Sequence, residues 1–181
     1  AREAGAYAVE LVKAGRKPSE LITREVLMNA VMFDMAVAGS TNAVLHLLSY
    51  AYELGIRMTL ADFEKYAGQI PCINAVVPSG PYTVVDFHYA GGVMNVMKQL
   101  ESKLYTDVPG MYGNTWKEML SKVTPQENKV IHSLEQPLFR EPGLKILRGN
   151  LSPNGAIVRP TAVYEEVKYL KGKAKVFDGD R

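Results

Sequence analysis

Apolar residues recur at helical spacing through about the first two thirds of the chain. After Thr23, the apolar residues Val26, Ala30, Phe33 and Val37 lie three or four positions apart, which is the period of one face of an α-helix. The same period, with glycine stops and Ser or Thr starts, predicts helices over residues 2–14, 23–38, 40–54, 59–67, 84–89, 93–102 and 115–120. This part of the chain is therefore expected to be helix-rich.

Two of these helix starts carry the pattern of a capping box, Thr59 with Asp62 and Thr115 with Glu118. In a capping box the two side chains bond each other's backbone N–H groups, which otherwise have no partner in the first turn. Gly55 follows the helix predicted over residues 40–54 and can adopt the left-handed conformation that ends many helices. The boundaries of these helices are thus predicted by signals other than the apolar period.

The pattern changes near residue 127, where β-formers and turn residues take over. This stretch predicts strands over residues 129–133, 144–148, 156–158 and 175–177, and the segment 149–155 reads as a turn between strands. An earlier apolar stretch, residues 73–77 between two prolines, fits a strand or an extended segment. Helices followed by strands indicate two domains, and we place them at residues 1–140 and 141–181.

Composition narrows the class of protein. The chain has 181 residues, 47% of them hydrophobic and 22% charged, which is enough apolar material for a core. A net charge of +2 argues against nucleic acid as a partner, and no apolar run is long enough for a membrane span. One cysteine, Cys72, cannot form an internal disulfide and by itself cannot hold zinc or an iron–sulfur cluster. We therefore expect a cytoplasmic protein.

The sharpest local feature is a turn of small polar residues, Gly39 followed by Ser40, Thr41 and Asn42. Glycine permits a tight turn, and three hydrogen-bonding side chains then meet the free N–H groups of a helix start, which suits a carboxylate or a phosphate. The alternative is plain helix capping, since Ser, Thr and Asn are common N-caps. His46 lies one turn further on the same face and is either a contact for the same ligand or a structural histidine.

The other chemistry-bearing residues form no recognisable site. His88 and His132 are isolated in the sequence. Cys72 lies between a proline and an isoleucine, and we expect it to be a buried, unreactive thiol. Gly91–Gly92 fits no phosphate-binding or dinucleotide-binding pattern. The chain has no nucleophile elbow and no pair of histidines at metal-binding spacing. The residues alone therefore indicate a globular protein with helices and strands, and assign it no catalytic, cofactor-binding or metal-binding residue.

Four ordered segments together resemble the dihydroxy-acid dehydratase/phosphogluconate dehydratase family. They are TREVLMNA (23–30), GSTNAVLHL (39–47), PSG with DFHYAGG (78–80 and 86–92), and LRGNLSPNGAIV (147–158). The second segment is similar to the family's GGSTNxxxHL motif, with Ala38 in place of the first glycine. Three stretches look closer to the enzymes of this family that act on sugar acids such as gluconate and pentonates: DFHYAGG (86–92), residues 130–137 and LRGNLSPNG (147–155).

The resemblance implies a fold and an activity. The fold is α/β: the first domain would be the helix-rich, C-terminal part of a three-layer α/β/α dehydratase domain, and the second would begin a β-barrel-like domain. The activity would be loss of water from a sugar acid or 2,3-dihydroxy acid to give a 2-keto acid. In the family an iron–sulfur cluster acts as Lewis acid on the leaving hydroxyl, a magnesium site holds the substrate, and a serine takes the proton.

The resemblance also implies that these residues are an internal fragment. The cluster cysteines and magnesium ligands are expected before Ala1 and the base serine after Arg181. The fragment itself is then expected to bind no cofactor and to be inactive, with the rest of its own chain, a hydroxy-acid substrate and further copies of the full-length protein as partners. Of its own residues, Ser40, Thr41, Asn42 and His46 are the candidates for substrate binding or for a place near the active site.

Two other functions fit the residues. One is a non-catalytic binding or regulatory domain derived from this family, whose natural chain would end near these boundaries. The other is a different enzyme that uses His46 with Asn42 and Ser40. The first predicts a native protein of about 20 kDa. The second predicts an activity of the isolated chain that is lost in His46→Ala.

Overall fold

The structure is a computed structural model that describes residues 2–110 and 113–179. Its helices run in the order α1 (Arg2–Lys13), α2 (Pro18–Leu21), α3 (Arg24–Ala36), α4 (Thr41–Glu53), α5 (Leu60–Ala67), α6 (Val84–Tyr89), α7 (Gly92–Gln99) and α8 (Trp116–Leu120). Two strands follow, β1 (Lys145–Gly149) and β2 (Ser152–Val158). Three 3₁₀ turns complete the described elements, η1 (Glu101–Lys103), η2 (Pro160–Ala162) and η3 (Glu165–Val167). The expected helix-rich first part is confirmed.

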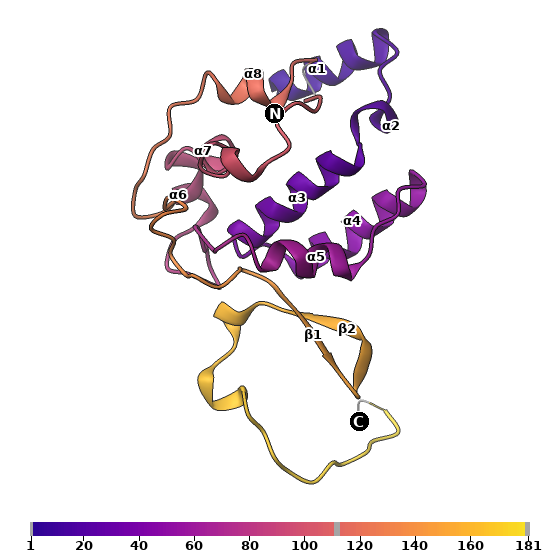
Figure 1. Cartoon of the computed structure of the whole chain (residues 1–181), viewed down its shortest axis with the longest axis vertical. Helices are drawn as coiled ribbons and strands as arrows, with labels where there is room; N and C mark the ends of the chain where they lie inside the picture. The colour runs from indigo at the N-terminus through magenta and orange to yellow at the C-terminus, as the bar shows by residue number, and fades with distance from the viewer. Residues whose placement is uncertain (1, 111–112, 180–181) are drawn as a thin grey trace.

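Helix α3 is the centre of the core. It contacts α4, α5 and α7, and it runs between the α4–α5 pair and the α6–α7 pair (Figure 1). Its side chains Val31, Met32 and Met35 are almost completely buried, and Phe63 of α5 packs into the same cluster. The cluster also includes Leu144, at the start of the β-hairpin, so the first and last parts of the chain share one core. That core positions the turn between α3 and α4.

The helix starts predicted at Thr23, Thr59 and Thr115 are confirmed, whereas α2 was not predicted. The Thr23 hydroxyl accepts a hydrogen bond from the Val26 backbone N–H at 3.3 Å, which caps α3. The two predicted capping boxes are present at α5 and α8, and Thr83 forms a third one at α6. The longest helices of the described residues, α3 and α4, have 13 residues each, and none has the length and apolar character of a membrane span.

Three buried asparagines hold long connecting segments in place. The Asn29 amide exchanges two hydrogen bonds with the backbone of Tyr105, at 2.8 and 2.9 Å. The Asn95 amide does the same with the backbone of Gln126, and Asn74 donates to the Val130 carbonyl at 2.7 Å. Because an asparagine side chain offers both a donor and an acceptor, it can bond the N–H and C=O groups of a buried backbone segment that has no neighbouring strand.

The strand-rich part is a two-stranded antiparallel hairpin. Lys145 pairs with Val158 and Gly149 with Ser152, with a bulge between Leu147 and Gly149. This confirms the strands expected over 144–148 and 156–158. The segment 149–155 is not a loop throughout, because β2 already begins at Ser152. The hairpin lies below α5 in Figure 1 and joins it through Arg148, which pairs with Glu64 at 2.8 Å.

Two predicted strands were wrong. Residues 129–131 form bends and residues 132–133 have no regular structure. The Asn128 side chain accepts hydrogen bonds from the backbone N–H groups of Val130 and Ile131, so these two groups are not free to pair with a neighbouring strand. Residues 175–177 have no regular structure, and Val176 is 87% exposed. Neither stretch joins a strand or a bridge in the described part of the chain, although the His132 N–H donates to the Ile73 carbonyl at 2.9 Å. Residues 73–77 form the extended segment allowed by the sequence, with isolated bridges from Cys72 to Phe139 and from Val76 to Tyr82.

Candidate functional site

The polar turn predicted from sequence lies between α3 and α4, at the surface. Ser40 is the N-cap of α4, and its hydroxyl accepts a hydrogen bond from the Asn42 backbone N–H at 3.2 Å. Ser40, Thr41, Asn42 and His46 are all exposed. The buried stripe of α4 is on the opposite side, where Val44 is fully covered. The structure therefore places the four candidate residues together on one accessible helix start.

The backbone of this turn differs from the expected one. The residue in the left-handed region is Ala38, at φ 46°, and not the glycine beside it. Gly39 is needed for a different reason: a Cβ there would lie 1.8 Å from an oxygen of the Asp34 carboxyl group. Its N–H also donates to the Asp34 carbonyl at 3.0 Å. The turn is therefore wrapped tightly around Asp34, which sequence reasoning did not select.

Asp34 is a buried carboxyl group on the last turn of α3, with only 7% of the residue exposed. Burial raises its pKa from 3.8 to about 7, while the Arg159 guanidinium and the Ser40 backbone amide both lower it. Near neutral pH this carboxyl group is therefore divided between its charged and neutral forms. The sequence does contain one indication of this buried carboxyl group, because Asp34 is an acidic residue inside the apolar run VMFDMA.

Arg159 reaches this place from the far end of the chain. It follows β2, and its Nη1 donates to the hydroxyl of Ser79 at 3.1 Å. Ser79 is only 8% exposed and lies in the loop that follows the cis peptide bond between Val77 and Pro78. We call Asp34, Ser79 and Arg159 the junction cluster, because they come from three segments that are distant in sequence. No local pattern in the sequence predicts this meeting.

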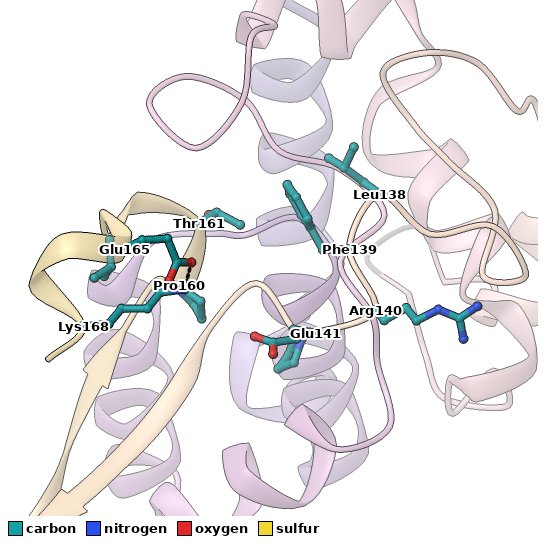
Figure 2. Close-up of a pocket in the computed structure, with 10 residues that line it drawn as sticks. Leu138, Phe139, Arg140, Glu141, Pro160, Thr161, Glu165 and Lys168 are labelled. Carbon is teal, nitrogen blue, oxygen red and sulfur yellow. Dashed lines mark hydrogen bonds and ion pairs between the residues drawn. The ribbon is translucent and has the colours of Figure 1, made fainter.

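A cavity of about 540 Å³ is lined by Pro160 and Thr161, the two residues that follow Arg159 in the chain. Figure 2 shows it between the linker from α8 to β1 (residues 121–144), which carries Leu138 and Phe139, and the turns with Thr161 and Glu165. An ion pair between Glu165 and Lys168 closes one side. The cavity is lined by none of the four candidate residues of the α4 start. It is a gap between the linker and the last turns, and it adds no residue to the candidate site.

The described residues do not fit an iron–sulfur cluster or a magnesium site. Within the described residues, 2–110 and 113–179, no three His, Cys, Asp or Glu side chains lie close enough together to hold a metal ion. The thiol of Cys72 is fully buried and donates to the Asn74 carbonyl at 3.1 Å, and burial raises its pKa to about 11. A single buried thiol outside any such group of three side chains does not provide a metal site.

Ser40→Ala tests whether the Ser40 hydroxyl stabilises the start of α4 as a helix cap. Loss of the hydroxyl that accepts the Asn42 N–H should destabilise the chain by about 1 kcal/mol, the usual value of a serine N-cap. Urea unfolding at pH 7 measures the change, with the exposed neighbour in Thr41→Ala as the matched control. Equal stability of the two variants would show that the Ser40 hydroxyl is not needed for the fold.

Comparisons with known proteins cover both parts of the chain. Residues 1–119 match the family described as dihydroxy-acid/6-phosphogluconate dehydratase N-terminal, and residues 129–181 match the C-terminal family of the same enzymes. The chain is 39% identical to the dihydroxy-acid dehydratase of Clostridium novyi and 40% identical to that of Methanosarcina barkeri. These alignments cover 99% and 98% of this chain, and 33% of each relative.

The dihydroxy-acid dehydratase of Ignicoccus hospitalis is similar to the same extent, at 40% identity over 98% of the chain and 33% of the relative. The chain thus spans about one third of the length of the curated relatives it matches. The polar turn and the junction cluster lie within the matched residues, with Asp34 and Ser40 in the N-terminal match and Arg159 in the C-terminal one. With both matches in order along the sequence, this chain belongs to the dihydroxy-acid/6-phosphogluconate dehydratase family.

Proposed function

We propose that these residues are part of a hydro-lyase that removes water from a hydroxy acid with two neighbouring hydroxyl groups and yields a 2-keto acid. The observation that carries this proposal is the ordered match of both family segments over nearly the whole chain. The relatives bear the name dihydroxy-acid dehydratase, which supports a carbon–oxygen lyase. Because the chain spans a third of their length, the activity would belong to the complete protein.

The proposed substrate class is a sugar acid, with a 2,3-dihydroxy acid as the alternative. The stretches at residues 86–92, 130–137 and 147–155 support the sugar acid, because they resemble that subgroup. The names of the relatives favour the dihydroxy acid. An assay that offers gluconate, a pentonate and dihydroxy-isovalerate side by side separates the two.

The proposed cofactors are an iron–sulfur cluster and magnesium, held by parts of the complete protein other than these residues. A metal would supply the Lewis acid that a departing hydroxide needs, since hydroxide is a poor leaving group. The described residues contain no ligand set, and their own part would be to shape the substrate side of the site. We propose in addition that the complete enzyme is cytoplasmic and forms homo-oligomers.

The proposed role of Ser40, Thr41, Asn42 and His46 is to bind the carboxylate of the hydroxy acid. A helix start combines free N–H groups with the positive end of the helix dipole, and both attract an anion. The exposed position of all four residues leaves that helix start accessible. We also propose that the domains are residues 1–140, within a three-layer α/β/α domain, and 141–181, at the start of a β-barrel-like domain.

An assay of the complete reading frame that contains this chain tests the proposed function. The protein is purified without oxygen, and 2-keto-acid formation is measured with each of the three acids. We expect activity in the complete protein and none in residues 1–181 alone. Asn42→Ala is expected to raise the KM at least about tenfold, because a charged hydrogen bond contributes about 1.5–3 kcal/mol.

The control variant is Glu53→Gln, at the other end of the same helix, which should leave the KM unchanged. A complete protein that binds the acids without converting them would contradict the proposal and favour a binding domain. Activity of the isolated chain, lost in His46→Ala, would instead favour a different enzyme.

A further inference from the structure

The hairpin contains the one Asn-Gly pair of the sequence, Asn154 followed by Gly155. Asparagine is a thermolabile residue, because the backbone nitrogen of the next residue can attack its side-chain amide carbon. Glycine is the neighbour that hinders this attack least, since it has no Cβ. Whether the pair reacts therefore depends on how the fold holds these two residues.

The register of the hairpin leaves both residues outside the ladder. Two ladder pairs flank them, Leu147 with Ala156 and Gly149 with Ser152. Between these pairs, residues 153–155 have only one residue of β1 opposite them. The extra residues of such a bulge are left out of the regular pairing of the strands. Strand pairing therefore does not fix the reacting pair.

The side chain of Asn154 is not held either. Asn154 is exposed, and its amide has no hydrogen-bond partner in the part of the chain that the structure describes. The buried asparagines differ, because Asn29 and Asn95 each exchange hydrogen bonds with a distant backbone segment. A side chain held in this way cannot turn towards the next backbone nitrogen, whereas that of Asn154 can.

Gly155 is a glycine that the fold requires. Its φ is 106°, in a region that residues with a side chain rarely adopt. A Cβ there would also lie 2.8 Å from Cδ1 of Leu60 and 3.5 Å from Cγ2 of Ile146, so this part of the hairpin packs against α5 and β1. The Ser152 hydroxyl donates to the Gly155 carbonyl at 2.9 Å. The conformation that requires glycine thus places the least hindered nucleophile directly after an unrestrained asparagine.

We propose that Asn154 is a site of spontaneous deamidation in the complete protein. The backbone nitrogen of Gly155 forms a bond to Cγ of Asn154, the bond from Cγ to Nδ2 breaks, and ammonia leaves with the proton of the Gly155 N–H. The five-membered succinimide that results takes up one water molecule at either of its two carbonyl carbons. One opening gives aspartate, and the other gives isoaspartate, whose main chain is longer by one methylene. Both products carry a negative charge that asparagine lacks.

The complete protein, kept folded in mildly alkaline buffer, provides the test. Trypsin releases residues 149–168 as one peptide, because Arg159 is followed by a proline. We expect an aspartate and an isoaspartate form of this peptide to accumulate, and fragmentation in the mass spectrometer should place the change at Asn154. Hydroxylamine, which attacks the succinimide, should cut the folded chain between Asn154 and Gly155.

Asn154→Gln is the matched variant and is expected to lose both forms of the peptide, because a glutamine would have to close a larger and less favourable ring. The backbone of Asn154 has no positive φ, so glutamine can adopt it. The internal control is Asn150, which is also exposed and lies in the same peptide but precedes a leucine. It should stay intact while Asn154 reacts.

Two results would overturn the inference. One is a peptide that changes at Asn154 only after the protein is unfolded in urea, which would show that the fold protects the pair. The other is an equal rate at Asn150, which would show that Gly155 contributes nothing. The readout is a mass and not an activity, so the result does not depend on the proposed function.

The isoaspartate product should also loosen the hairpin. The extra main-chain atom enters directly before Gly155, whose place is set by its contact with Leu60 and its hydrogen bond from Ser152. The amides of residues 152–156 are therefore expected to exchange faster in aged complete protein than in fresh protein. Aged Asn154→Gln protein should show no such change. Unchanged exchange in a sample rich in isoaspartate would contradict the tight packing of this segment against α5.

Discussion

Gly143→Ala is expected to destabilise the chain by about 3 kcal/mol or more. A Cβ at Gly143 would lie 2.3 Å from Cα and 2.5 Å from N of Ala38, and 2.7 Å from the carbonyl oxygen of Met35. All three are backbone atoms, which have no rotamer to change. Gly143 also donates its N–H to Met35 at 2.8 Å, so the two segments cannot separate without losing that hydrogen bond. Urea unfolding at pH 7 measures the loss.

The control for this prediction is Gly149→Ala. Gly149 is also a glycine of the last part of the chain, but a Cβ there meets nothing within 4 Å and its φ is not positive. We expect its free energy of unfolding to stay within about 0.5 kcal/mol of the unaltered chain. Equal stability of the two variants would contradict the close approach of the linker to the α3–α4 turn.

Asp34→Asn is expected to remove a large part of the pH dependence of stability between pH 4 and pH 8. The unfolded chain releases the Asp34 proton near pH 4, while burial holds the pKa of the folded state at about 7. The folded chain therefore binds more protons in this range, and its stability falls as the pH rises from about 4 to about 7. The difference between the two pKa values corresponds to about 4 kcal/mol.

The measurement is the difference in unfolding free energy between Asp34→Asn and the unaltered chain, taken by urea unfolding at several pH values. It should shift by about 4 kcal/mol in favour of the variant from pH 4 to pH 8. Asp86→Asn is the control, because Thr83 lowers the pKa of the exposed Asp86 and its loss should act in the opposite direction. A constant difference for Asp34→Asn would mean that water reaches this carboxyl group when the chain is folded.

The helices were predictable because their signals are local. Thr23, Thr59 and Thr115 act within three residues of the backbone they cap, and the apolar period of α3 lies within one element. The strand at 129–133 was not predictable as a bend, since β-forming residues there are overruled by one side chain, that of Asn128. The β-propensity of a segment depends on its own residues and their immediate neighbours. A side chain that bonds the backbone N–H groups of the segment can prevent the strand that this propensity predicts.

The candidate site was predictable only in its exposed half. The Ser40–Asn42 turn has a recognisable pattern, and the structure confirms it as the start of α4. Asp34 and Arg159 were not predicted as residues near the site, because their surroundings are formed by segments that are far apart in sequence. The same holds for Gly39, whose lack of a side chain serves the approach to Asp34 and not a left-handed turn.

The single thiol of the chain lies beside this junction. Cys72 packs with Ala38 and Ala75 against Leu138, and its backbone pairs with Phe139 of the linker at 3.0 Å in both directions. A reagent can reach its sulfur when the linker lifts away from the α3–α4 turn. The rate at which a thiol reagent alkylates Cys72 would therefore report how often the two family segments separate from each other.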